Sequence, residues 1–330
     1  MKHVSIFVLA YRSLAFLQGG TLSSVEAAAR RLELEGYEVS LVFLDNYSRD
    51  GSVQWVMAHH PDADVLLAPT NYLYCKGTNV GLQYCERRYR PDYFILVDAD
   101  NFAEPNAYAE LLAYAEAHPR AGLVQPLVRG HEDHSVLYSC GHRFLDDGQC
   151  RPMQELPADL SALDDLVSCS ISSTLVRRGV FEACGLLDPV YDIYFESSDL
   201  SFRARRAGFR CACHVGAVTY NEGTDGAGVD RFHNRYYFNR NRVVFWKLHD
   251  EARFRHVREI QEGIYRGLQA EFEASEYGLD VEREAIRKGI EDGLRLIDDP
   301  LLPRRPPIAL ADFDKSAVVV LQSGRPARPR

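Results

Sequence analysis

The chain has 330 residues, of which 46% are hydrophobic and 26% charged, a composition typical of a globular protein with an ordinary core. Its formal net charge of -9 argues against nucleic acid as a partner, because contact with a phosphate backbone needs a basic face. No apolar run approaches the roughly 18 residues of a transmembrane helix, and the short run Val4–Ala10 precedes no cleavage site, so we expect neither a membrane span nor a secretory signal.

The first third of the chain alternates apolar strands with helices. Strands are predicted at Val4–Ala10, Glu38–Leu44, Ala63–Ala68 and Tyr93–Val97, and helices at about Thr21–Gly36, up to about His59, at Gly77–Arg88 and from about Pro105 to Ala117. This alternation predicts an α/β fold with a mostly parallel sheet flanked by helices on both faces.

The rest of the chain has shorter strands and then helices. Strands are predicted at Leu123–Val128, Ser135–Phe144, Val167–Val176, Arg210–His214 and Ala217–Tyr220, and helices near Asp199–Ala207, at Ala252–Ser275 and at Val281–Ile297. We therefore expect a main domain over residues 1–245, in two halves (1–120 and 121–245), and a C-terminal helical extension with a flexible tail over residues 246–330.

The predicted helical extension carries an apolar stripe at helical spacing. Its members are Ile260, Ile264, Leu268, Phe272, Ile286, Ile290, Leu294 and Ile297. Two hypotheses stay open for this stripe: it packs on the main domain, or it joins two copies of the chain in a homo-oligomer.

The cysteines and the basic C-terminal end bear on location. The eight cysteines contain no Cys-x-x-Cys pair and are spread over a long chain, which favours free thiols in the cytoplasm. Arg304-Arg305 and residues 325–330 are basic, and we expect a solvated tail there, with peripheral contact at the inner face of a membrane as the alternative.

Polar residues follow the ends of the predicted parallel strands, where open α/β sheets bind their ligands. The carboxylates Asp98 and Asp100 come directly after a buried strand, one residue apart. Such a pair is electrostatically unfavourable unless a cation lies between its members, and carboxylate oxygens suit Mg²⁺ or Mn²⁺. The alternative is a simple loop cap, since Asp-x-Asp is common by chance.

Seven segments, in order, make residues 3–245 resemble the family 2 glycosyltransferases with the GT-A fold. These are Val4–Tyr11, Val42–Ser52, Asn71–Leu82, Asp98-Ala99-Asp100, Gly185–Asp188, Tyr194–Leu200 and Arg240-Asn241. The resemblance implies transfer of a sugar from a UDP-, dTDP- or GDP-linked donor, with inversion, to a hydroxyl of a glycan, a lipid-linked sugar or a protein, typically in surface polysaccharide assembly. It also implies that residues 1–120 bind the nucleotide and residues 121–245 the acceptor.

The resemblance assigns donor and metal residues. Asp98 and Asp100 stand at the metal motif, so Mn²⁺ or Mg²⁺ is the expected cofactor. The expected donor contacts are Ala10, Tyr11, Asp45, Asn71, Lys76 and Asp98. A cap for the helix after Gly51 is the alternative role of Asp45, and a solvated surface lysine is that of Lys76.

Two departures from the family pattern concern the base and the metal, besides Leu9 and Arg12 in place of a usual proline and asparagine in the first strand segment. Ser197 stands where the family usually has its aspartate base, and a serine hydroxyl is too weak a base, so Glu196 or Asp199 is expected to take the role. Asn221 stands where many relatives carry a histidine that completes the metal shell. Both departures also favour a second hypothesis, a catalytically degenerate GT-A domain that binds a nucleotide sugar or acts as a scaffold.

Overall fold

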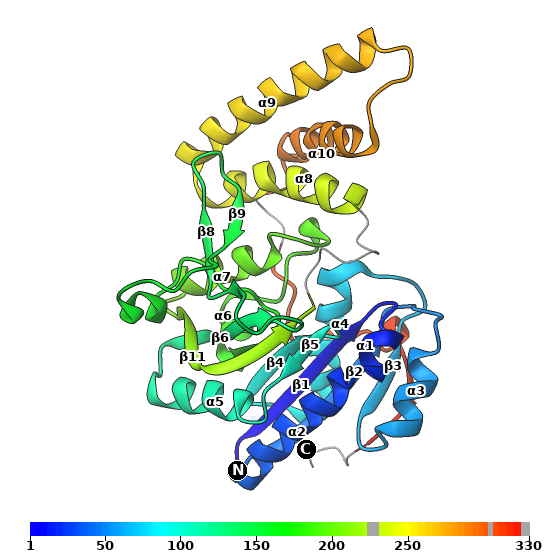
Figure 1. The fold of residues 1–330 in the computed structure, drawn as a ribbon, viewed down its shortest axis with the longest axis vertical. Coiled ribbons are helices and arrows are strands. Elements are labelled where there is room, and N and C mark those ends of the chain that lie inside the picture. Colours follow the sequence, from blue (N-terminus) through cyan, green and yellow to red (C-terminus); the bar gives the residue numbers. More distant parts are fainter. Residues whose placement is uncertain (223–230, 303–305, 325–330) are drawn as a thin grey trace.

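A computed structural model describes residues 1–222, 231–302 and 306–324, and within these ranges it contains one ten-stranded sheet and one small two-stranded sheet (Figure 1). The large sheet has the order β12-β3-β2-β1-β4-β10-β6-β11-β5, with β7 paired to β6. Its strands are β1 (His3–Ala10), β2 (Glu38–Asp45), β3 (Asp64–Leu67), β4 (Tyr93–Asp98), β5 (Asn101–Ala103), β6 (Ala121–Gly130), β7 (Leu137–Ser139), β10 (Thr174–Arg177), β11 (Arg210–Asn221) and β12 (Val319–Gln322). The small sheet is the hairpin of β8 (His142–Phe144) and β9 (Cys150–Pro152).

The centre of the large sheet is parallel, as the alternation of strands and helices predicts. β1 pairs in parallel with β2 and β4, β2 with β3, and β6 with β11, whereas β5, β7, β10 and β12 run antiparallel to their neighbours. Ala10 lies opposite Asp45, and Leu9 lies opposite Asp98. The polar ends of β1, β2 and β4 therefore meet at one edge, and the predicted mixed α/β fold with a mostly parallel sheet is confirmed.

Helices cover both faces of the sheet. The helices of the described residues are α1 (Leu14–Gln18), α2 (Thr21–Leu34), α3 (Ser52–His59), α4 (Leu73–Tyr89), α5 (Ala107–Ala117), α6 (Arg178–Cys184), α7 (Glu196–Arg206), α8 (Arg231–His249), α9 (Glu251–Ala274) and α10 (Val281–Ile297), with short 3-10 turns at Leu160–Asp164, Pro189–Tyr191 and Lys315–Ala317. One apolar core joins α2 and α5 to the sheet, and a second joins α4, α6, α7 and α8.

Alternation along β1 serves both cores, since Ile6 and Val8 belong to the first and Phe7 and Leu9 to the second. Gly81 lets α4 approach β1 closely, because a Cβ there would lie 1.9 Å from the Phe7 ring.

Several predicted elements differ from the structure. The strand predicted at Ser135–Phe144 is two short strands, β7 and β8, which belong to different sheets. The helix predicted from Gly77 begins four residues earlier, at Leu73. The strand predicted at Val167–Val176 is wrong over its first part, because side chains of Ser201 and Gln125 bind the N–H groups of Cys169 and Ser170 and leave only β10 for the sheet. The two strands predicted between 210 and 220 are one strand, β11, with an irregular step between His214 and Val218. The helix predicted from Asp199 begins three residues earlier.

The helices after residue 231 gather at one end of the molecule (Figure 1). α10 packs on α8 where Gly289 and Gly293 would place a Cβ 2.3 and 2.6 Å from the carbonyl oxygens of Tyr236 and Arg240. On α9, by contrast, Ile264 and Phe272 stay exposed. Part of the predicted stripe thus packs within the chain, and the homo-oligomer stays a prediction.

The C-terminal stretch returns to the sheet instead of forming a tail throughout. β12 pairs antiparallel with β3 and forms the edge of the sheet, and the Gly324 N–H donates to Asp64 at 2.7 Å. The basic residues Arg304, Arg305 and 325–330 lie outside the described residues. Of the helices in the described ranges, none is both long and apolar enough to cross a membrane.

Candidate active site

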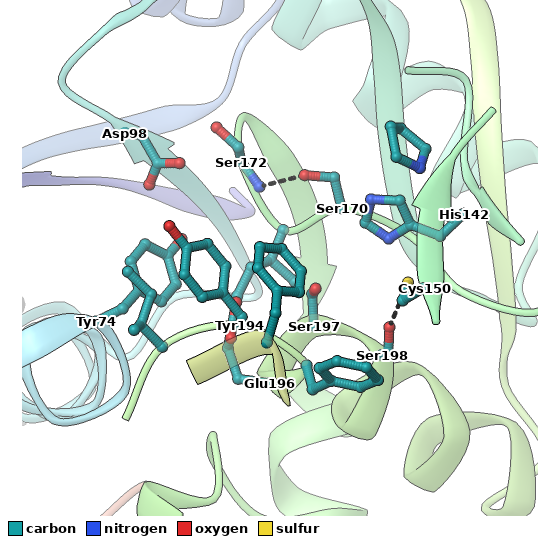
Figure 2. A pocket seen from close by; sticks show the side chains of 15 residues that line it. Tyr74, Asp98, His142, Cys150, Ser170, Ser172, Tyr194, Glu196, Ser197 and Ser198 are labelled. Atoms are coloured by element: carbon teal, nitrogen blue, oxygen red, sulfur yellow. Dashed lines mark hydrogen bonds between the residues drawn. The ribbon is translucent and has the colours of Figure 1, made fainter. Parts of the chain in front are cut away.

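A pocket of about 270 Å³ opens between the end of β4 and the start of α7 (Figure 2). Its walls come from the sheet edge, the 168–173 loop, the β8–β9 hairpin, the segment before α7, and α8. The lining residues are Tyr74, Asp98, His142, Cys150, Pro152, Ser170, Ile171, Ser172, Ile193, Tyr194, Phe195, Glu196, Ser197, Ser198 and Phe238. The pocket therefore joins the predicted metal motif to the predicted base.

Asp98 lies at one side of the pocket, at the end of β4. Burial, and then the neighbouring Asp100 carboxylate, raise the pKa of Asp98 to about 6. The hydroxyls of Ser172 and Tyr74 donate hydrogen bonds to this carboxylate. Two neutral donors thus fix the orientation of Asp98 without neutralising its charge.

Asp100 is held by two asparagines. Asn101 Nδ2 donates to its Oδ1 at 3.0 Å, and the Asn221 side chain forms a second hydrogen bond with the carboxylate. Burial nevertheless raises the pKa of Asp100. Asn221, on β11, therefore contacts the Asp98–Asp100 pair directly, at the position where many relatives place a histidine.

The two carboxylates suit a divalent cation. Asp98 ends β4 and Asp100 lies in the turn that follows it. Burial opposes the ionisation of both, and their oxygens are the hard ligands that Mg²⁺ and Mn²⁺ prefer. Across the described ranges, no three His, Cys, Asp or Glu side chains converge as a complete protein metal cage. A cation here would take its remaining ligands from a substrate or from water, as Mg²⁺ commonly does.

Glu196 faces the same pocket from the first residue of α7. Burial, and to a smaller degree the charge of Asp98, raise its pKa to about 7, although backbone N–H groups of Glu196 and Ser197 bind the carboxylate and oppose the shift. Its Oε2 is buried and lacks a hydrogen-bond partner within the described part of the chain. An ionisable oxygen with a pKa near neutrality and no partner is suited to accept a proton.

Asp199 has a different environment. The Arg203 guanidinium lies 2.6 Å from Oδ2, and His249 Nε2 lies 2.8 Å from Oδ1. Burial acts to raise the pKa of Asp199, but Arg203 and His249 outweigh it and hold the pKa below its ordinary value. Asp199 is not among the residues that line the described pocket. Its contacts are those of an anchor for α7.

The segment that presents Glu196 is strained and is held by α8. Tyr194 and Phe195 have φ values of 67° and 69°, a left-handed conformation that is costly for bulky residues. Asn241 Nδ2 donates to the carbonyl oxygens of Tyr191, Ile193 and Tyr194 at 2.8, 2.8 and 2.9 Å. Arg240 binds Asp192 at 2.8 Å in the same segment. The Arg240-Asn241 pair thus fixes the path of the chain into Glu196.

Comparisons with known proteins identify the family of the chain. The family model described as "Glycosyltransferase like family 2" matches residues 2–241. The chain belongs to this family.

Similar proteins include "Low-salt glycan biosynthesis hexosyltransferase Agl10" of Haloferax volcanii, 23% identical over 207 residues that cover 62% of this chain and 66% of that protein. Similar solved structures include the mannosyltransferase PcManGT from Pyrobaculum calidifontis in complex with GDP-Man and Mn²⁺ (TM-score 0.54, 13% identity, 88% of this chain and 86% of that one). S. aureus TarS 1-349 in complex with UDP-GlcNAc is also similar (TM-score 0.51, 15% identity, 97% and 96%), although the chain covers only 50% of a longer TarS structure. These structural similarities show the GT-A fold.

The donor residues expected in this family 2 glycosyltransferase lie at the same edge of the sheet. Asp45 is buried, with Oδ1 accepting the Ser48 N–H at 2.8 Å and Oδ2 buried without a partner among the described residues. Asp45 therefore caps the turn at Ser48. The alternative role expected for it was to cap α3, which begins at Ser52 after Gly51, but there it is Asp50 that accepts the Ser52 N–H, at 3.0 Å. The Asn46 N–H donates to the Ala10 carbonyl at 2.7 Å, so β1 and β2 end side by side.

Three further expected donor contacts, Tyr11, Asn71 and Lys76, are not among the residues that line the described pocket. Tyr11 has an exposed ring with the Arg12 guanidinium 5.2 Å from its centroid. Asn71 Oδ1 accepts from Asn46 Nδ2 at 3.1 Å and from the Leu73 N–H at 2.8 Å, so it braces the turn before α4. Lys76 lies inside the first turn of α4, with its Nζ 4.0 Å from the centre of the Tyr72 ring.

Sequence patterns did not identify Tyr74, Ser172 and Asn241 as functional residues. The first two bind Asp98, and the third holds the segment before Glu196. Asn241 stands in a segment that carries the family resemblance, which was a signal that it has a role. Tyr74 also lies in such a segment, Asn71–Leu82, whereas Ser172 lies in none of the seven.

Proposed function

We propose that this family 2 glycosyltransferase moves a hexosyl or deoxyhexosyl group from a nucleoside-diphosphate sugar to a hydroxyl, with inversion at the anomeric carbon. The observation that carries the proposal is the buried, unpartnered Oε2 of Glu196 in one pocket with Asp98. Family membership supports it, as do a relative named as a hexosyltransferase of glycan biosynthesis and structural neighbours in complex with GDP-Man and UDP-GlcNAc.

Glu196 is the base of the proposed reaction. Its Oε2 takes the proton of the acceptor hydroxyl while the acceptor oxygen forms a bond to the anomeric carbon and the bond from that carbon to the diphosphate breaks. A pKa of about 7 allows Glu196 to be ionised near neutral pH and still hold the proton it accepts. Asp199, paired with Arg203 and His249, anchors the helix instead.

Asp98 and Asp100 are the proposed ligands of Mn²⁺ or Mg²⁺, with the Asn221 amide beside them. When bound, the cation would offset the negative charge that develops on the departing nucleoside diphosphate. Tyr74 and Ser172 orient Asp98, and Asn101 and Asn221 orient Asp100, so the pair is arranged before substrate arrives. This arrangement limits the reorganisation needed when the donor binds.

Donor recognition is assigned to the edge formed by β1, β2 and the turn before α4. Asp45 is the proposed contact for the base or ribose, Ala10 and Tyr11 border the base, and Asn71 and Lys76 lie on the phosphate side. The buried, unpartnered Oδ2 of Asp45 supports its role, since a ligand N–H or O–H would satisfy it. Surface glycan or glycoconjugate assembly in the cytoplasm is the proposed setting, which eight free cysteines support.

A transfer assay with the purified chain tests this proposal. UDP-, dTDP- and GDP-sugars are supplied with Mn²⁺, Mg²⁺ or chelator, and thermal shifts identify the base that binds, because a specific ligand stabilises the fold as RT ln(1 + [L]/Kd). We expect the nucleotides of one nucleobase to stabilise the chain, and the sugar of the corresponding donor to be transferred or slowly hydrolysed in the presence of metal. Absence of binding by every nucleotide would refute the proposal.

The second candidate function is a nucleotide-sugar-binding domain without transfer, which Ser197 favours. Ser197 lines the pocket at the position of the family's usual aspartate. Donor binding without transfer or hydrolysis would support this candidate. A gain of turnover in Ser197→Asp would then identify a lost base.

A further inference from the structure

The lining of the pocket includes a partly open aromatic face. Phe238, on α8, stacks on Tyr194 with ring centroids 4.2 Å apart and planes 16° from parallel. Phe238 is 41% exposed, so stacking covers only part of the ring and leaves the rest accessible at the pocket. An aromatic face that is held in place and partly open offers the apolar C–H face of a sugar ring a flat contact of fixed orientation.

Apart from Asp98 and Glu196, the polar side chains that line the pocket are neutral. Ser170, Ser197 and Ser198 bring hydroxyls, and His142 brings an imidazole from the β8–β9 hairpin (Figure 2). Burial lowers the pKa of His142 to about 4, so its ring carries no charge at neutral pH. Hydroxyl and neutral imidazole groups both donate and accept hydrogen bonds, as the hydroxyls of a sugar require.

Charged acceptors fit this pocket poorly. Among the described lining residues there is no Lys or Arg, while Asp98 and Glu196 are both acidic. A phosphate or carboxylate placed beside Glu196 would meet like charge without a compensating cation. A serine or threonine side chain of a protein has no ring face to stack on Phe238.

We propose that the acceptor hydroxyl belongs to an uncharged sugar residue of a glycan, whose ring lies against Phe238 and whose other hydroxyls bind His142 and the serines of the wall. This inference rests on the proposed function and selects among its acceptors. Phe238 is then a residue that determines acceptor specificity, in the same pocket as Asp98 and Glu196.

The test measures acceptor binding and transfer by the full chain with the donor that thermal shifts identify. The probes are methyl glycosides of neutral hexoses, methyl glucuronide, farnesyl phosphate and a Ser/Thr-containing peptide. Binding of each probe is followed by saturation-transfer NMR in the presence of the nucleoside diphosphate and metal. This readout reports on the acceptor site even where turnover is slow.

We expect neutral glycosides to bind and to accept the sugar. Phe238→Leu should raise the KM for the glycoside about tenfold and change the donor KM by less than about twofold, because only the aromatic face is lost. Phe238→Tyr keeps that face and should retain the wild-type KM. Phe272→Leu is the matched control, since Phe272 is also 41% exposed but lies on α9, and it should not alter the KM.

Several outcomes would overturn the inference. Preferred transfer to farnesyl phosphate, to the glucuronide or to the peptide would do so, and so would an unchanged glycoside KM in Phe238→Leu. Donor binding without binding of any neutral glycoside would overturn this inference alone. Loss of donor binding as well would overturn the proposed function.

Discussion

Replacing Glu196 with glutamine should lower turnover and at the same time stabilise the fold. Glutamine keeps the size of the side chain but accepts no proton at Oε2, so transfer should fall by roughly 10²–10⁴ while the donor KM changes little. Glu196 is only 7% exposed, and its Oε2 has no partner among the described residues. An ionised carboxylate there is unfavourable to the folded state, and an amide removes that cost.

The size of the stability change follows from the pKa. The carboxyl has an ordinary pKa of 4.5 and a pKa of about 7 in the fold. The difference of about 2.5, at about 1.4 kcal/mol each, gives roughly 3 kcal/mol. Below pH 4.5 the carboxyl is protonated in both states and costs nothing. The unfolded chain releases the proton first as the pH rises, so the destabilisation grows from pH 4.5 and is complete above pH 7.

Two measurements on metal-free protein and one on the active enzyme test this reasoning. Urea unfolding of wild type and Glu196→Gln should give equal free energies near pH 4.5 and a more stable variant at pH 8. The wild-type turnover should rise about tenfold per pH unit below pH 7 and level off above it. Asp199→Asn is the matched control and should destabilise, because it breaks the pairs with Arg203 and His249. A Glu196→Gln variant that is less stable at pH 8, or that transfers sugar at the normal rate, would refute the assignment.

Four further predictions concern the metal, the donor, the strained segment and the extension. Asp98→Asn or Asp100→Ala should abolish metal-dependent transfer with the circular dichroism spectrum unchanged; full activity of either variant in chelator would contradict the metal assignment. Asp45→Ala should weaken donor binding by calorimetry more than it slows turnover, and an unchanged affinity would leave Asp45 only its cap at Ser48. Asn241→Asp removes the two N–H donors that contact three carbonyl oxygens and should lower the unfolding free energy by about 1–3 kcal/mol, measured in urea, with a lower turnover; wild-type values would mean that Asn241 does not hold the segment. If the exposed Ile264 and Phe272 of α9 join two copies, light scattering should give twice the 37.4 kDa chain mass, and a monomeric mass would exclude the oligomer.

The parts of the fold that the sequence predicts are those set by local patterns. Apolar strands followed by turn residues placed Asp45 and Asp98 at strand ends, and the register of β1, β2 and β4 brings those ends together. The irregular second half was less predictable, because its backbone groups bind distant side chains such as Gln125 and Ser201. β12 was missed because its partner strand lies near the start of the chain.

The structure was needed to choose between Glu196 and Asp199 as the base, although one of the two ion-pair partners of Asp199 is close to it in the sequence. Arg203 lies four residues after Asp199 on the same helix, a spacing typical of an ion pair. His249 comes from the end of α8, and no pattern around Asp199 indicates it. The hydrogen bonds from Tyr74 and Ser172 to Asp98 likewise join segments that only the folded chain brings together.

The pairing of β12 with β3 has a consequence for synthesis of the chain on the ribosome. Leu67 pairs with Val319, about 250 residues later, and translation at roughly 5–20 residues per second needs on the order of 10–50 s to reach it. Throughout this interval β3 is an uncovered edge strand, able to pair with a neighbouring nascent chain. Chains truncated before residue 319 would keep that edge open permanently, so aggregation during expression is the expected result of C-terminal truncation even where every residue of the pocket is intact.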